Sequence, residues 1–259
     1  MERDRTEEVW RMLDRDALAE LAHAGPRPVF ATISGAHLYG FASRDSDVDL
    51  RGAFLHSTKE MLGLHPPKET LTVERKEEGL ELDWVAHDLR KFARMMTSHN
   101  GYVLEQLFSP LVVVRTPALP ILLELGKGCL TRPTVRHYRG FARGRRKRLA
   151  EPDPTVKHLL YAYRVLLTGI HLMDSGELVS NLPTLNERFR LREIDDLIAR
   201  KREGTEKMAL DATDLNVHGA LLDALEAQLD AAHGASHLPE VAPAAEAIDA
   251  FVVALRMAG

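Results

Sequence analysis

The residues best suited to chemistry lie between positions 34 and 49, where a glycine turn is followed by two carboxylates. Ser34 to Gly40 reads SGAHLYG, and Asp47-Val48-Asp49 follows after a short gap. On a strand, residues two apart share a face, so Asp47 and Asp49 can converge while Val48 and Leu50 enter the core. Carboxylate oxygens are the ligands that Mg²⁺ prefers, and substrate phosphates and water commonly complete its shell. The spacing therefore favours a metal-held triphosphate and a nucleotide-dependent reaction.

A third carboxylate lies in a later segment with strand-like alternation. Asp83 shares a parity with Glu81 and Val85 and faces away from Leu82 and Trp84. We expect Asp83 to join the two earlier aspartates at one site. Because Glu81 is on the same face, a solvent-facing acidic strand is the alternative interpretation.

Short strands must position these carboxylates. Residues 28–34 predict a strand that enters the turn at Gly35, and residues 48–55 predict a second strand with Asp49 and Arg51 on one face. Residues 70–74 and 80–86 predict a hairpin joined through the polar stretch 75–79. A 3.6-residue period predicts helices at about 6–24, 88–97, 102–107, 117–127, 133–149, 155–175, 191–203, 211–233 and 241–257.

Composition places the chain among ordinary globular proteins. Hydrophobic residues make up 45% and charged residues 28% of the 259, which excludes disordered and fibrous classes. The single cysteine, Cys129, cannot form an intrachain disulfide, and the charged N-terminus lacks the apolar core of a signal peptide. No apolar window is long enough to span a membrane. We expect a cytoplasmic protein without a membrane partner; no pattern indicates an oligomeric state.

One segment is strongly basic although the net charge of the chain is −4. Between Arg132 and Arg148 there is no acidic residue, and the cations are Arg132, Arg136, Arg139, Arg143, Arg145, Arg146, Lys147 and Arg148. Such a segment could follow the phosphate backbone of an RNA acceptor. A solvated helix end, where cations favour the helix dipole, is the equal alternative.

A second basic group falls on one helix face further along the chain. Lys157, Tyr161 and Arg164 lie at i, i+4 and i+7, so they can present a basic surface to a triphosphate. Arginine suits bidentate contact with phosphate and lysine suits a point contact. A face packed through ordinary ion pairs is the alternative.

Together these motifs resemble the polymerase-β-type nucleotidyltransferase superfamily. Residues 34–40, Asp49-Leu50-Arg51-Gly52 and Leu89-Arg90-Lys91-Phe92 are similar to the predicted bacterial and phage nucleotidyltransferases associated with RNA repair. The resemblance is weaker in residues 156–164 and 181–185 and covers about residues 28–205. It implies an α+β fold: a catalytic domain with a mixed sheet and flanking helices in residues 1–112, then an all-α domain in residues 113–259.

The resemblance implies transfer of a nucleoside monophosphate from an NTP to a hydroxyl, most plausibly at an RNA end, with release of pyrophosphate. Mg²⁺ or Mn²⁺ is the implied cofactor, and two ions about 3.5 to 4 Å apart would hold the attacking and leaving oxygens. Asp47 and Asp49 are then expected to position metal and triphosphate, and Asp83 to coordinate the ion that activates the acceptor hydroxyl. Backbone N–H groups at the glycine turn would approach the phosphates.

The turn departs from the family pattern at one position. The family normally has Gly-Ser where this chain has Gly35-Ala36, so a hydroxyl donor to phosphate is missing. Such a donor is worth roughly 1.5 to 3 kcal/mol. The nucleotide-binding residues are expected to be Ser34, Gly35, Ala36, Arg51, Lys157, Tyr161 and Arg164. Ala36 also favours a second hypothesis, a nucleotide-binding regulatory or toxin-neutralising module with little turnover.

Overall fold

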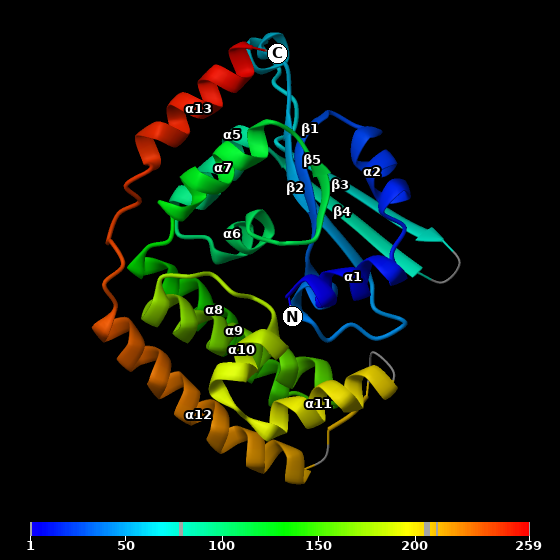
Figure 1. The fold of residues 1–259 in the computed structure, drawn as a ribbon, viewed down its shortest axis with the longest axis vertical. Helices are drawn as coiled ribbons and strands as arrows, with labels where there is room; N and C mark the ends of the chain where they lie inside the picture. Colours follow the sequence, from blue (N-terminus) through cyan, green and yellow to red (C-terminus); the bar gives the residue numbers. More distant parts are fainter. Residues whose placement is uncertain (1, 78–79, 205–207, 211, 259) are drawn as a thin grey trace. The chain divides into compact units, whose positions relative to one another are not determined.

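A computed structural model describes residues 2–77, 80–204, 208–210 and 212–258 of the chain (Figure 1). The chain forms two compact units. The sheet unit comprises Met1–Leu38, Asp47–Cys129 and Ala242–Gly259, and the helical unit comprises Tyr39–Ser46 and Leu130–Val241. The predicted domain boundary between residues 112 and 113 stays a prediction.

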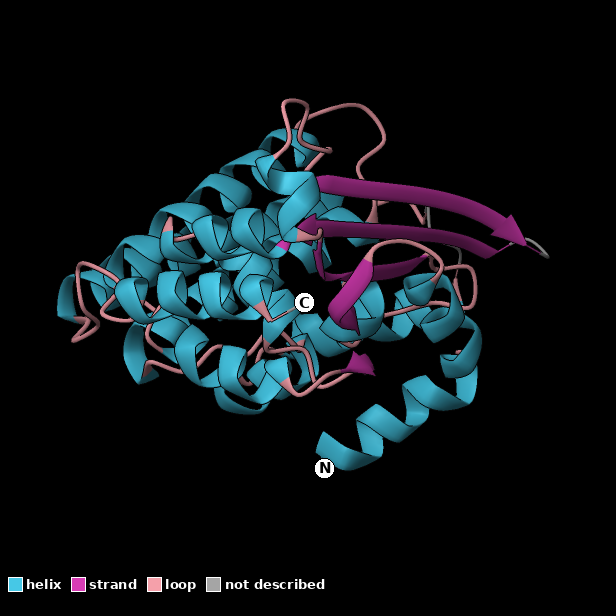
Figure 2. Ribbon diagram, turned by 90° about the horizontal axis from the view of Figure 1, so that it is seen from above, coloured by secondary structure: helices cyan, strands magenta, loops and turns pink. Residues whose placement is uncertain are grey.

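The sheet unit is built on five strands in the order β3-β4-β2-β1-β5. Their bounds are β1 Arg27–Ile33, β2 Val48–Leu55, β3 Thr70–Glu77, β4 Leu80–Asp88 and β5 Val112–Arg115. Strands β2 and β4 are parallel, whereas the other neighbouring pairs are antiparallel. The sheet is therefore mixed, and the predicted α+β fold is confirmed. Figure 2 shows β3 and β4 as long neighbouring strands, which pair antiparallel; residues 78–79, which separate them in the sequence, lie outside the described residues.

The helices of the sheet unit lie before, between and after these strands in the sequence: α1 Glu2–Met12, α2 Arg15–His23, α3 Gly35–Tyr39, α4 Thr58–Leu62, α5 Leu89–Thr97, α6 Gly101–Leu107, α7 Ala118–Lys127 and α13 Ala245–Met257. The last residue of α3, Tyr39, is the first residue of the helical unit. Helix α5 buries an apolar face on the sheet, where Phe92 meets Phe30 edge to face at 5.3 Å. The single helix expected over residues 6–24 is wrong. Asp14 ends the first helix because its side chain accepts hydrogen bonds from the N–H groups of Asp16 and Ala17 and caps α2.

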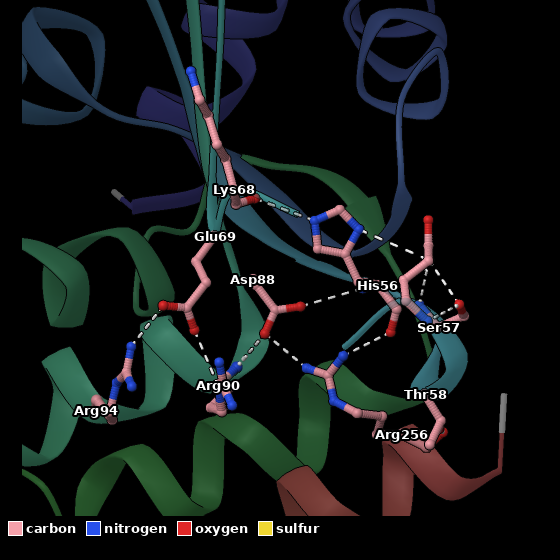
Figure 3. A network of polar contacts seen from close by, with 10 residues as sticks. His56, Ser57, Thr58, Lys68, Glu69, Asp88, Arg90, Arg94 and Arg256 are labelled. Carbon is pink, nitrogen blue, oxygen red and sulfur yellow. Dashed lines mark hydrogen bonds and ion pairs between the residues drawn. The ribbon is translucent and has the colours of Figure 1, made fainter. Parts of the chain in front are cut away.

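Figure 3 shows how α13 is tied to the ends of two strands. Asp88, which is completely buried, accepts hydrogen bonds from Arg256 Nη2 at 2.7 Å and from the N–H of His56 at 3.2 Å. Arg256 Nη1 donates to the His56 carbonyl at 2.6 Å. Because Asp88 also caps α5 by accepting from the Arg90 N–H, one carboxylate joins strands β2 and β4 to two helices.

The helical unit is organised around α9, Val156–Ser175, which packs against α8 Val135–Leu149, α10 Leu182–Phe189, α11 Arg192–Glu203 and α12 Ala212–Ala235. A short 3₁₀ turn, Arg132–Thr134, precedes α8. The apolar face of α9 lies in the core, where Leu159, Leu160, Leu166, Leu167 and Ile170 are buried. In the described part of the chain, no helix combines the length and apolarity that a membrane crossing requires.

Helix α10 was not expected from the sequence. Pro183 lies in the first turn of α10, where a missing N–H costs nothing. Asn181 caps this helix by accepting a hydrogen bond from the Thr184 N–H at 3.2 Å. The motif at residues 181–185 is therefore a helix start.

Candidate active site

Two of the predicted carboxylates lie side by side on the sheet. Asp49 of β2 is the register partner of Asp83 of β4, so their side chains share one face. On the opposite parity, Val48, Leu50 and Trp84 are buried in the core. The strand parity predicted for both aspartates is confirmed, and it places the two acids as neighbours at the polar face.

The glycine turn approaches the same carboxylate. Gly35 has a φ of +61°, and a Cβ built on it would lie 2.8 Å from Asp49 Cγ, so a larger residue would displace the carboxylate. The Ser34 N–H donates to the Asp49 carbonyl at 2.8 Å. Within the described chain, the buried Ser34 hydroxyl has no hydrogen-bond partner. A hydroxyl in that condition is available to a bound group.

Arg51 ties the two carboxylates together. Its Nη2 donates to Asp49 Oδ1 at 2.5 Å and to Asp83 Oδ2 at 2.8 Å. Its Nη1 donates to the carbonyls of Leu50 and Asp83, and its Nε donates to the Tyr102 hydroxyl at 2.9 Å. A guanidinium has five N–H groups, so these five contacts use its whole donor capacity inside the sheet unit.

Arg51 keeps its positive charge in this environment. Burial acts to lower its pKa, but Tyr102 and the carboxylates Asp49 and Asp83 outweigh that effect, and the pKa is raised. Sequence reasoning missed Tyr102, which comes from α6 and has no local signal that pairs it with β2. A permanent cation therefore sits against both aspartates.

The pair also suits a divalent cation. Asp83 Oδ1 has no hydrogen-bond partner among the described residues, so one carboxylate oxygen is available to a ligand. No cluster of three or more His, Cys, Asp or Glu side chains that could hold a metal occurs in the described ranges. Mg²⁺ is usually bound by one or two carboxylates and completed by substrate phosphates, so the neighbouring Asp49 and Asp83 could supply its protein ligands.

Asp47 lies at the entrance of β2, is exposed, and adds to the raised pKa of Lys76 after the larger contribution of Glu81. The residues just before it belong to the helical unit and are well anchored there. Lys201, fully buried, donates to Ser43 Oγ at 2.7 Å, and Ser43 Oγ donates to Asp45 Oδ1 at 2.7 Å. The segment that leads to the aspartates is therefore held by side-chain hydrogen bonds.

Gly40, at the start of that segment, has a φ of +83° and lies against the beginning of α10. A Cβ at Gly40 would be 2.7 Å from Asn181 Nδ2 and 2.8 Å from Pro183 Cδ. Two motifs far apart in the sequence, the glycine turn and residues 181–185, thus meet at Gly40.

The predicted residues Lys157, Tyr161 and Arg164 lie on α9 in the helical unit. Lys157 Nζ is 5.9 Å from the centre of the Tyr161 ring, and Arg164 lies over the Tyr39 ring at 4.0 Å. Arg145 of α8 stacks on the other residue of this group, Tyr161, at 4.8 Å. In these contacts a cation lies against the face of an aromatic ring, which attracts it electrostatically.

This positive field affects two histidines beside the group. Burial, followed by the nearby Arg164, lowers the pKa of His137 to about 4. Burial and then Arg148, Arg145 and Lys157 lower the pKa of His158. In both cases burial and the neighbouring cations disfavour the protonated imidazole.

Comparison with known proteins gives a family for this arrangement. The chain matches the RlaP family, described as RNA repair pathway DNA polymerase beta family, over residues 11–254. It is also 28% identical over 219 residues to "Uncharacterized protein YcgL" of Bacillus subtilis (strain 168), covering 80% of this chain and 82% of that protein. The family match runs through residues of both units and extends beyond the motifs of residues 28–205.

Proposed function

The chain belongs to the RNA repair pathway DNA polymerase beta family, and from that premise we propose that it transfers a nucleoside monophosphate from an NTP to a hydroxyl at an RNA end, releasing pyrophosphate. The family supports a nucleotidyltransferase-type role in RNA repair. The observation that carries the finer proposal is the register pair Asp49 and Asp83 beside the bare Gly35 backbone.

Within this proposal Asp47, Asp49 and Asp83 hold Mg²⁺ or Mn²⁺ together with the triphosphate. The bound ions would stabilise the charge that develops on the phosphoryl group in transfer. Asp49 and Asp83 orient the reacting groups, because their strands fix them as neighbours on one face. Catalysis of this kind depends on positioning and electrostatics, so no nucleophilic side chain is required.

Further residues are assigned to the nucleotide. Gly35 lets the backbone come close to a phosphate, Ser34 supplies a buried hydroxyl without another partner among the described residues, and Ala36 adds no donor. In the helical unit, Lys157, Tyr161 and Arg164 are assigned to phosphate contact because they lie at i, i+4 and i+7 on one face of α9. The Arg132–Arg148 segment is assigned to the RNA acceptor.

Labelled nucleotides test the proposal. NTPs carrying ³²P at the α or at the γ position are incubated with the protein, Mg²⁺ or Mn²⁺ and a mixed RNA pool. We expect label from the α position to enter RNA, none from the γ position, and none with Asp49→Ala. Glu81→Gln, on the same strand and face as Asp83, is the control and should keep the activity. Transfer of γ label, or undiminished transfer by Asp49→Ala, would contradict the proposal.

A second candidate is a nucleotide-binding regulatory or toxin-neutralising module with little turnover. Two observations favour it: Ala36 lacks the usual hydroxyl, and the Arg51 guanidinium already forms ion pairs with both aspartates. Calorimetry would then show binding of NTP and metal without transfer to any acceptor. Ala36→Ser should tighten NTP binding by about ten- to a hundredfold if the turn contacts phosphate.

A further inference from the structure

The basic segment 132–148 divides into two groups once its contacts are known. Four of its cations pair with acids: Arg132 with Glu240, Arg139 with Asp230, Arg146 with Asp223 and Glu226, and Arg148 with Glu151. A fifth, Arg145, stacks on Tyr161. These five side chains are held within the helical unit and have structural partners.

The other three cations form what we call the open stripe: Arg136, Arg143 and Lys147. All three are exposed, and the described residues offer them no ion pair or hydrogen bond. They are seven and four positions apart on α8, which places them within about 40° of one another around the helix. Along the axis they span about 16 Å at 1.5 Å per residue. The unpartnered charge is therefore concentrated in one line.

Two glycines, Gly140 and Gly144, lie on the same exposed side of α8. A Cβ built on Gly140 or on Gly144 meets no atom within 4 Å, so packing does not require glycine at either position. Glycine inside a helix costs roughly 1 kcal/mol relative to alanine. Its usual benefit is close approach of another chain's backbone. The glycines leave a strip without side chains next to the line of cations.

We propose that the open stripe binds the phosphates of a single RNA strand, whose backbone lies along the bare strip formed by Gly140 and Gly144. This inference deepens the proposed function, on which its choice of RNA rests, because it names the surface that receives the acceptor. A solvated helix face would need neither the alignment of the cations nor the glycines.

The number of phosphate contacts determines how much RNA affinity and salt dependence should be lost. Each phosphate contact on a single strand contributes about 0.7 to the slope of log K against log salt concentration. Three contacts therefore contribute about 2 to that slope, and losing them at about 0.1 M salt weakens binding about a hundredfold. The paired cations of the segment contribute little, because their charge is already matched by acids.

The test measures binding of a short fluorescent single-stranded RNA to the full chain by anisotropy over a range of salt concentrations. The stripe variant combines Arg136→Gln, Arg143→Gln and Lys147→Gln. The matched control combines Lys59→Gln, Arg115→Gln and Arg192→Gln, which removes two arginines and one lysine from exposed positions elsewhere. A third variant, Arg136→Lys with Arg143→Lys, keeps the charge. Thermal unfolding checks that each variant is folded.

We expect the stripe variant to lose about a hundredfold in affinity and about 2 in slope, while the control and the lysine variant stay within about threefold of the wild type. Equal losses in the stripe variant and the control would overturn the proposal. Binding to phosphatidylserine vesicles is measured in parallel. If the stripe variant loses vesicle binding while its RNA binding is unchanged, the proposal is also overturned. The assay contains no NTP, so a failure of nucleotidyl transfer would not affect its result.

Discussion

Asp49 and Asp83 are register partners on the parallel strands β2 and β4, and a single nitrogen of Arg51 donates to both carboxylates. The positive charge of this shared neighbour offsets the repulsion between the two adjacent carboxylates. The arrangement gives Arg51 the role of a positioning residue, since all its donors are used on protein atoms.

Kinetics of Arg51 variants separate positioning from nucleotide binding. Arg51→Met removes the shared cation, so the two carboxylates repel each other and lose their orientation. We expect kcat to fall with little change in KM for the NTP. Arg51→Lys keeps the charge and should recover part of kcat. A rise in KM with unchanged kcat would instead assign Arg51 to the nucleotide.

Gly35→Ala tests the close approach of the turn to Asp49. The substitution forces a side chain into the left-handed region and into the Asp49 carboxylate. We expect NTP binding, measured by calorimetry, to be lost while the fold is kept. Gly219→Ala in α12 is the control: nothing lies within 4 Å of its added Cβ, and alanine should raise the free energy of unfolding by about 0.5 to 1 kcal/mol. Wild-type NTP affinity in Gly35→Ala would show that the turn does not bind phosphate.

Arg256→Met tests the attachment of α13. Removing Arg256 leaves the fully buried Asp88 without its charged partner, which typically costs about 3 to 5 kcal/mol of unfolding free energy. Chemical denaturation measures this loss. Thr58→Val is the control, because it removes a single half-buried hydrogen bond to the Arg256 carbonyl and should cost only about 1 kcal/mol. Similar costs for both variants would mean that the buried pair does not hold the helix.

His87 predicts how stability responds to acid. Burial, followed by Lys91 and Arg51, lowers its pKa from 6.5 to about 4. Lys91 donates to Thr70 Oγ1, which leaves the Thr70 hydroxyl to donate to His87 Nδ1 and favours the neutral ring. The unfolded chain binds this proton more readily, so the stabilisation is complete above pH 6.5 and is lost as the pH falls toward about 4.

Thermal unfolding across that pH window checks the prediction. His87→Asn should unfold with a shallower dependence on pH than the wild type, because its side chain does not titrate. Parallel curves for the two proteins would show that the His87 pKa is not lowered in the folded state.

Local patterns predicted much of this structure. Alternation placed Asp49 and Asp83 on the correct parity of their strands, and the helical period found the buried face of α9. The predicted hairpin was correct, although β3 extends to Glu77, since cross-strand pairing continues through charged residues such as Lys76 and Glu81.

Tertiary contacts decided what the sequence could not show. Tyr102 reaches Arg51 from another element, and Arg256 reaches Asp88 across 168 positions, so neither pairing leaves a local signal. Register also matters: Glu74 of β3 is the partner of Asp83, which sets a third acid in one row across three strands. Parity alone gives the face of a residue, whereas its neighbour depends on strand order and alignment.

Manganese binding is the most direct test of the central claim, that Asp49 and Asp83 hold a divalent ion with the nucleotide. Electron paramagnetic resonance measures the affinity of the protein for Mn²⁺ in the presence of a non-hydrolysable NTP. We expect Asp83→Asn to lower that affinity by roughly tenfold or more, since even an outer-shell partner is worth that much, while Glu81→Gln leaves it unchanged. Equal Mn²⁺ affinity in Asp83→Asn and the wild type would contradict the claim.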